Sequence, residues 1–498
     1  MEHVSPVKTG SSRHLIAALL ASSMLLTPSA FANDDEKDSD ANSNTSAAQS
    51  TAAQSLEERV LKLENLLQQL VSRLAATDSQ VGDQAQVLLE EAEDIKELQV
   101  QIAEEREEMQ RMDEEIREVA SNVTREMLPG FAVGNTQVSY GGFVKIDAIS
   151  SFYSDRNGPA SGIASSSIGR DFYLPGLVPA GGGGSASVFD LNPRETRFIF
   201  STETPAGEDT IKSLIEFDFQ VTNGGNERVS SSFLPRMRQA YLTYKGFLIG
   251  QAWTTFQDVA ALPENLDFIG PAEGTTFNRQ PLIRYTTGKW EVAVESPETT
   301  VTTAAGGRLT PGSDRFPDLV VRYTEKGDWG HIKAAGILRE LRVEEGAVAG
   351  IIGDSEVGYG LSLSGKLKVG EKDDFRFMGT AGTGLGRYVA TNLVNGVAIN
   401  PDGTLKTIAT YNGFASMRHF WDDKFRSNLS LGYFKADNPT DLTGFGVTDE
   451  AYSLHANLIY SPAPQISFGV EYMIARRKLE SGLDGYLNRA QFSAKYGF

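Results

Sequence analysis

Polar and apolar side chains alternate with a period of two residues along the last third of the chain. Residues 491–498 show this pattern and end on an aromatic residue. A period of two places successive side chains on opposite faces of a β-strand, so one face meets an apolar medium and the other meets water. The pattern returns roughly every twenty residues back to Ser139. We therefore predict a series of antiparallel strands, each with one apolar face.

Sixteen segments fit this description. In one of them, Ile215, Phe217 and Phe219 alternate with Glu216 and Asp218. An even number of such strands, with aromatic residues near the ends of the apolar faces, is typical of a closed transmembrane β-barrel. The predicted strands are 139–153, 194–204, 211–222, 236–245, 246–254, 281–287, 289–297, 317–325, 329–341, 355–369, 373–387, 406–419, 424–436, 450–461, 464–478 and 486–498.

The connections between these segments alternate in length. The connections after even-numbered strands are short, such as Lys245-Gly246, whereas those after odd-numbered strands are long, the first covering residues 154–193. This parity separates a periplasmic rim of turns from an outer rim of loops. We predict that both ends of the barrel face the periplasm.

The N-terminal segment has the features of an export signal. Lys8 and Arg13 precede an apolar run from Leu15 to Leu26, and residues 30–32 have the small-x-small form of a cleavage site. The apolar run is too short to cross a hydrocarbon core of about 30 Å, so we predict cleavage after Ala32 rather than an anchor. Residues 33–55 contain no large apolar group, and we expect a disordered linker.

A heptad repeat occupies the next segment. Every seventh residue from Val60 to Val123 is apolar, whereas the second apolar position of the heptad is polar in its middle part, at Thr77, Gln84 and Glu91. A strict seven-residue repeat indicates a supercoil rather than one helix lying on a globular surface. We predict a periplasmic coiled coil over residues 56–127. A helical hairpin is the alternative, but the segment contains no turn signal.

Charge and cysteine content exclude several classes of protein. Of the net charge of −19, residues 33–126 carry −15 and residues 127–498 carry −5. The acidity belongs to the N-terminal arm, and no segment is basic enough to bind nucleic acid. The chain has no cysteine, and no later stretch has eighteen consecutive apolar residues, which argues against a helical membrane protein. No His or Cys group has metal spacing, so we predict no cofactor.

The connection that follows the fifth strand carries candidate chemistry. Residues 255–280 are rich in acidic side chains, and in their order and length they are similar to the third outer loop of sixteen-stranded trimeric porins, which folds into the lumen and narrows it. Alternatively, a connection of this length could lie on the outer surface. The candidate carboxylates are Asp258, Glu264, Asp267 and Glu273.

Arginine residues gather on the strands beside this connection. Lipid-facing arginine at mid-depth costs about 2–4 kcal/mol, so most of these side chains should point into the lumen, where a guanidinium suits a carboxylate solute. The alternative is that an arginine holds the acidic loop in place. The candidates are Arg194, Arg197, Arg236, Arg238, Arg279, Arg284 and Arg322.

An enzyme is the main competing interpretation. His331, His419 and His455 are the histidines beyond the predicted signal, and His455 lies between Ser453 and Asn457 on one strand face. This arrangement superficially suggests a hydrolase. We instead interpret His455 as a polar lumen residue, because the sequence places no activating carboxylate within reach.

Several framework segments carry a family resemblance. Residues 141–147, 194–198, 238–241, 250–256 and 262–268 resemble the DcaP-like outer-membrane porins. The resemblance covers nearly all of the chain after the predicted signal. It implies a trimeric sixteen-stranded barrel with a periplasmic coiled coil, and uptake of small hydrophilic solutes with a leaning to anions such as dicarboxylates. The glycine run at 181–184 lengthens the first loop and puts the outer gating of that family in doubt here.

The predicted function is passive diffusion across the bacterial outer membrane. The C-terminal Tyr496 and Phe498 resemble the signal read by the barrel-assembly machinery. Predicted partners are two further copies of the chain in a homotrimer, outer-membrane lipid and small anionic solutes, and no nucleic acid. A general non-selective porin and a structural tether that reaches the cell wall through the coiled coil are the alternatives.

Overall fold

A computed structural model describes residues 61–69, 128–156, 167–221, 230–347 and 353–498 of the protein. The chain divides into two compact units between Ala52 and Ala53, and the described residues belong to the second. The predicted signal peptide, the linker and most of the coiled coil lie outside the described residues, and residues 61–69 form an α-helix. No helix in the described ranges is long and apolar enough to cross a membrane.

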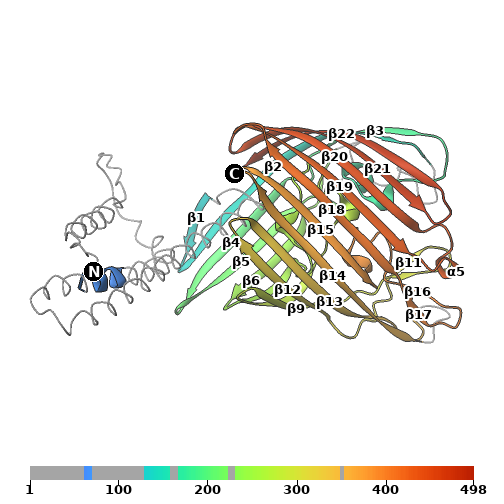
Figure 1. Ribbon diagram of the computed structural model, residues 1–498, viewed down its shortest axis with the longest axis horizontal. Coiled ribbons are helices and arrows are strands. Elements are labelled where there is room, and N and C mark those ends of the chain that lie inside the picture. Colours follow the sequence, from blue (N-terminus) through green and yellow to red (C-terminus); the bar gives the residue numbers. More distant parts are fainter. Residues whose placement is uncertain (1–60, 70–127, 157–166, 222–229, 348–352) are drawn as a thin grey trace, which may run out of the picture. The chain divides into compact units, whose positions relative to one another are not determined.

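Sixteen antiparallel strands close into a β-barrel, which confirms the predicted fold class (Figure 1). Two of the elements, β3 and β4, lie one after the other along the same side of β2 and together make one interrupted strand of the wall. The wall consists of β2 (Thr136–Tyr153), β3 (Ala186–Asn192) with β4 (Arg197–Ala206), β5 (Asp209–Asp218), β6 (Arg236–Tyr244), β7 (Phe247–Trp253), β8 (Arg279–Thr287), β9 (Trp290–Glu295), β12 (Asp318–Gly327), β13 (Gly330–Val343), β14 (Asp354–Val369), β15 (Asp373–Thr383), β18 (Ala409–Phe420), β19 (Phe425–Asp437), β20 (Thr448–Ala463), β21 (Ile466–Leu479) and β22 (Asp484–Gly497).

The barrel closes where β2 meets β22. Phe143 to Tyr153 pair with Gly497 to Leu487, and the terminal Phe498 exchanges two backbone hydrogen bonds of 3.1 Å with Gly142. The N-terminal half of β2 pairs instead with the short strand β1 (Leu128–Val133). Closure pairs the backbone groups of the wall strands on both sides, as a hydrocarbon environment requires, although among the described residues β3 pairs with β2 alone.

Side chains alternate between the two faces of the wall as predicted. Ile215 is 41% exposed on the outside, whereas its neighbour Glu216 is 1% exposed on the inside. The outer face carries a band of apolar residues, including Leu361 and Val470. The core of the barrel lies inside the lumen, where residues of the outer connections pack against inward-facing apolar side chains such as Phe434 and Met473.

The outer connections differ from the prediction in three places. The segment predicted as the first loop, 154–193, contains the wall strand β3. The connection between β21 and β22 covers only residues 480–483, so the predicted parity of lengths is wrong for the last loop. Two other connections supply a four-stranded sheet made of β10 (Val301–Thr302), β11 (Arg308–Leu309), β16 (Val397–Ile399) and β17 (Leu405–Thr407). Such pairing between loops depends on tertiary contacts that alternation does not report.

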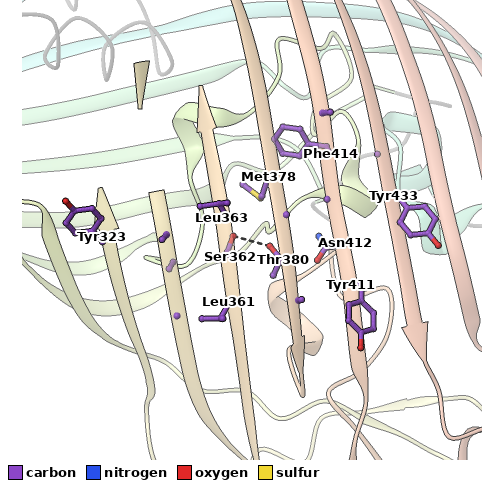
Figure 2. A pocket seen from close by; sticks show the side chains of 18 of the residues that line it. Tyr323, Leu361, Ser362, Leu363, Met378, Thr380, Tyr411, Asn412, Phe414 and Tyr433 are labelled. Atoms are coloured by element: carbon purple, nitrogen blue, oxygen red, sulfur yellow. Dashed lines mark hydrogen bonds between the residues drawn. The ribbon is translucent and has the colours of Figure 1, made fainter. Parts of the chain in front are cut away.

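A recess of about 1050 Å³ lies on the outer face of the wall, over β12 to β19 (Figure 2). Its flanks are the outward-facing Leu361, Leu363, Tyr411 and Tyr433, and Ser362 and Thr380 hydrogen bond at 3.1 Å behind it. Small outward-facing residues of β13, β15 and β18 form its floor. Because this face meets lipid, the recess is not part of a solute pathway.

Gly142 provides a test of the close approach between β2 and β4, beside the closing seam. Its φ is +151°, and a Cβ added there would lie 2.1 Å from the carbonyl oxygen of Arg197. We expect Gly142→Ala to destabilise the folded barrel by about 1–3 kcal/mol, because backbone on both sides prevents relaxation. Urea unfolding in detergent micelles, followed by heat-modifiable migration on gels, measures this loss.

Gly379→Ala is the matched control. Gly379 lies on the outward face of β15, and a Cβ there meets no heavy atom within 4 Å. Equal unfolding midpoints for the two variants would contradict the predicted clash between a side chain at position 142 and the backbone of β4.

Candidate functional site

The connection between β7 and β8, residues 254–278, lies inside the barrel and is called here the inner loop. It contains two short 3-10 helices, η3 (Val259–Ala261) and η4 (Ala272–Gly274). Its residues contact inward-facing side chains of β2, β13, β14 and β18 to β22, which form the opposite side of the wall. The inner loop therefore crosses the lumen and does not lie on the outer surface.

Asp258 begins the anchored part of the inner loop. Its carboxylate caps η3 through the backbone N–H of Ala260 and reaches His331 Nε2 at 2.8 Å and Lys333 Nζ at 2.9 Å on β13. Ser364 on β14 donates a further hydrogen bond at 3.2 Å. Burial disfavours the charge, but Lys333 and His331 outweigh burial and hold the pKa of Asp258 well below its ordinary value.

Glu264 makes the second anchor at the middle of the inner loop. Arg426 on β19 donates to both carboxylate oxygens at 2.9 Å, and Arg418 on β18 donates at 3.1 Å. The side chain keeps 29% of its surface exposed, so it borders water in the lumen. Burial opposes ionisation, but the hydrogen bonds and charges of Arg426 and Arg418 lower the pKa of Glu264 to about 2.

Asp267 and Glu273 hold the far end of the inner loop. Asp267 accepts from the backbone N–H of Tyr173 at 2.8 Å and lies 3.5 Å from Arg489 Nη1. Glu273 accepts from Ser453 Oγ at 2.5 Å, while its second oxygen is buried without a hydrogen-bond partner among the described residues. Burial raises the pKa of both carboxyl groups. Contacts from Tyr173, Ser453 and Arg489 therefore hold this end of the loop.

Four of the predicted arginines form a cluster around two carboxylates of β5. Arg238 binds Glu216 at 2.5 Å and Asp218 at 2.7 Å, Arg236 binds Asp218 at 2.8 Å, and Arg197 Nε lies 3.2 Å from Glu216. The fourth member is Arg279, described next. The carboxylate partners come from the neighbouring strand and not from the inner loop.

Arg279 makes no ion pair within 4 Å with a described carboxylate. Its guanidinium lies over the ring of Trp253, 4.7 Å from the centroid, and its Nη1 is buried without a hydrogen-bond partner among the described residues. Arg238 also faces Trp253, at 5.8 Å. Three guanidinium groups thus share two carboxylates and the fourth, that of Arg279, pairs with none among the described residues, which leaves an excess of positive charge beside an aromatic surface.

The three remaining predicted arginines hold backbone and loop structure. Arg284 donates to the carbonyl oxygen of Trp253 at 2.6 Å, and Arg322 donates to that of Gln257 at 2.7 Å, while both also face Glu291. Arg194 binds Asp171 of the first outer loop at 2.5 Å. These contacts correspond to the pinning role that the sequence left open.

The inner loop is held by cations that the sequence reasoning missed. That reasoning searched the strands beside the loop, but the loop crosses the lumen to the far wall. Alternation does mark these residues as inward-facing, since each occupies the polar face of its strand. The missed residues are His331, Lys333, Arg376, Arg418, Arg426 and Arg489.

Ser453, His455 and Glu471 lie in the order of a catalytic relay. Ser453 Oγ is 3.1 Å from His455 Nε2, and His455 Nδ1 is 3.2 Å from Glu471. All three side chains are buried, the Ser453 hydroxyl is donated to Glu273, and Glu471 accepts the backbone N–H of Leu266 at 2.7 Å. The group anchors the inner loop. No cluster of three potential metal ligands occurs in the described ranges.

A closed sixteen-stranded antiparallel barrel with an apolar exterior, a polar lumen and an anchored inner loop defines a porin-like channel of the outer membrane. The family model described as DcaP outer membrane protein matches residues 92–498. The chain belongs to the DcaP family of outer-membrane proteins, as the sequence resemblance indicated. A search of curated proteins returned no match.

The chain is similar to several solved structures, the first of which shows the same fold. The outer membrane channel DcaP of Acinetobacter baumannii is 21% identical, with a TM-score of 0.58, over 74% of this chain and 100% of that one. An anion-selective porin from Comamonas acidovorans is 10% identical, with a TM-score of 0.44, over 73% of this chain and 100% of that one. Salmonella typhi OmpF in complex with daunomycin is 12% identical, with a TM-score of 0.46, over 73% and 98%.

The low pKa of Glu264 predicts how the inner loop responds to acid. Because this pKa is depressed from 4.5 to about 2, the anchoring is fully present above pH 4.5 and is lost as the pH falls toward 2. We expect single-channel current to stay quiet from pH 7 down to about pH 4 and to become noisy below about pH 3. Glu264→Gln should be noisy already at pH 7.

Glu325→Gln is the control for that variant. Glu325 forms an exposed ion pair with Lys289 on the outer face of the wall, away from the inner loop. A quiet Glu264→Gln channel at pH 7 would show that Glu264 does not hold the loop.

Proposed function

We propose that this protein is a passive diffusion channel for small hydrophilic solutes that favours anions, including dicarboxylates. The observation that carries the proposal is the cluster in which Arg197, Arg236 and Arg238 share the two carboxylates Glu216 and Asp218, while Arg279 beside them pairs with no described carboxylate. An excess of fixed positive charge in a narrow lumen attracts anions and disfavours cations. Arg279, which lacks a carboxylate partner among the described residues, is the group best placed to receive a solute carboxylate.

The inner loop supports the same proposal because cationic side chains of the wall balance its negative charge. Asp258 and Glu264 are each bound by two cationic or potentially cationic side chains, and Asp267 faces Arg489. Burial favours the neutral form of Glu273. The acidic loop then narrows the pathway without imposing cation selectivity.

The proposed assembly is a homotrimer with three parallel pores. The heptad repeat of residues 56–123 favours association of several helices, and the even number of strands supports a periplasmic position for this segment and for both ends of the barrel. Removal of the signal peptide after Ala32 and recognition of Tyr496 and Phe498 by the barrel-assembly machinery belong to the same proposal. Contact between the coiled-coil tip and the cell wall would be compatible with transport.

The test measures reversal potential in a planar bilayer under a salt gradient, followed by addition of succinate. We expect the wild-type channel to prefer anions and succinate to reduce its current. Arg279→Gln should lower the anion preference and weaken the block by roughly three- to tenfold, because one uncompensated charge is lost.

Arg476→Gln is the matched control, since Arg476 lies on the outward face of β21 and pairs with Asp484 at 2.6 Å. It removes the same charge outside the lumen, and its selectivity should equal that of the wild type. Weak cation preference without succinate block in the wild-type channel would contradict the proposal and favour a general diffusion porin.

A further inference from the structure

We infer that Lys495, together with Arg197 and the ring of Phe143, forms a second anion site that adjoins the arginine cluster through Arg197, on the side of the mouth that holds the chain ends, and takes the carboxylate group of a solute there. This inference rests on the proposed passage of anions. It adds to that function the position of a second site, the side chains that form it and the mouth from which a solute reaches it. Lys495 belongs to none of the predicted constriction residues.

The barrel register places these side chains together. Lys495 on β22 pairs directly with Lys145 on β2, and Arg197 at the start of β4 pairs with Phe143 two residues before Lys145. Lys495, Lys145 and Phe143 occupy the inward face of their strands, because Asp147 and Ser493 on the same faces are buried in the lumen. Two cations from different strands therefore converge on one aromatic residue.

Phe143 is the platform of this site. Its side chain is buried, Lys495 Nζ lies 4.1 Å from its ring centroid, and Arg197 Cζ lies 5.1 Å from the same centroid. A cation over an aromatic face keeps its charge available to a further ligand, since the ring does not neutralise it. The Phe143 ring thus holds both cations in position without neutralising their charge.

The carboxylates in the neighbourhood are already engaged. Lys145 binds Glu195 and lies 3.4 Å from Asp147, while Glu216 is shared between Arg197 and Arg238. Within the described ranges no carboxylate lies within 4 Å of Lys495 Nζ, which lies over the Phe143 ring. Lys495 therefore forms no ion pair with a described carboxylate, and the residue is exposed.

The inner loop contacts the residues beside this site. The carbonyl oxygen of Leu266 in the loop accepts from Lys145 Nζ at 2.7 Å and from Gln491 Nε2 at 2.9 Å. Lys495 pairs directly with Lys145 and lies four residues beyond Gln491 along β22, toward the mouth where the barrel begins and ends. Arg279 begins β8, a strand that runs from the outer connection toward that same mouth. A solute carboxylate released at Arg279 would next meet Arg197 and Lys495 on its way to the mouth that holds the chain ends.

The test is one-sided block by succinate in planar bilayers, with the full-length channel inserted in a known orientation. We expect Lys495→Gln to lower the association rate of succinate added at the mouth that holds the chain ends by roughly threefold or more. Block by succinate added at the opposite mouth, where Arg279 lies, should change much less. Lys289→Gln removes an exposed lysine from a turn at the same mouth and should leave both rates unchanged.

Chemical rescue separates charge from structure. The chain contains no cysteine, so Lys495→Cys offers a single thiol. A reagent that attaches an aminoethylthio group restores a primary ammonium at this position and should restore the one-sided block, whereas a methylthio group should not. Heat-modifiable migration on gels confirms that each variant is folded.

The outcomes distinguish this inference from the proposed function. Wild-type block rates in Lys495→Gln, or equal rescue by the charged and neutral reagents, would overturn the second site while the anion channel stands. Absence of anion preference and of succinate block in the wild-type protein would overturn the proposed function, and the second site with it.

Discussion

Backbone hydrogen bonding around a closed wall is the constraint on which the rest of this structure depends. In hydrocarbon an unpaired peptide group costs several kcal/mol, so the strands must pair on both sides until β22 returns to β2. Phe498 and Gly142 complete that ring with their two reciprocal bonds. Once the ring is closed, period-two alternation assigns every second side chain to the lumen. A large number of polar groups is then confined in a narrow space.

The confined polar groups are satisfied mainly by one another and by the inner loop. Glu264 between Arg418 and Arg426, and Asp258 between His331 and Lys333, are charge-assisted contacts across the lumen. Removing one partner of such a pair leaves a poorly solvated charge, which costs more than the pair itself contributes. The loop is therefore held from several strands at once. A narrow passage of this kind can be rigid even though its backbone is irregular.

The same polar network determines the sign of the charge that lines the lumen. The barrel segment has an acidic net charge, yet the interior cluster around Glu216 and Asp218 contains more guanidinium groups than carboxylates. Selectivity in a pore depends on the charges that a solute meets and not on the net charge of the chain. Neither Arg279 nor Lys495 has a described carboxylate within 4 Å, and both lie over an aromatic ring. They are the side chains on which the proposed anion contacts depend.

Local periodicity was sufficient to place the strands, their faces, the C-terminal closing strand and the connection that becomes the inner loop. Each of these follows from side chains within a few residues of one another, as in the alternation of Ile215 with Glu216. Tertiary structure decided which charges meet. The arginines of β6 and β8 turn to carboxylates or rings of neighbouring strands, whereas Glu264 finds Arg426, which lies 162 residues further along the chain. Partners at such separations are set by the circumference and register of the closed barrel, and no local pattern in the sequence encodes them.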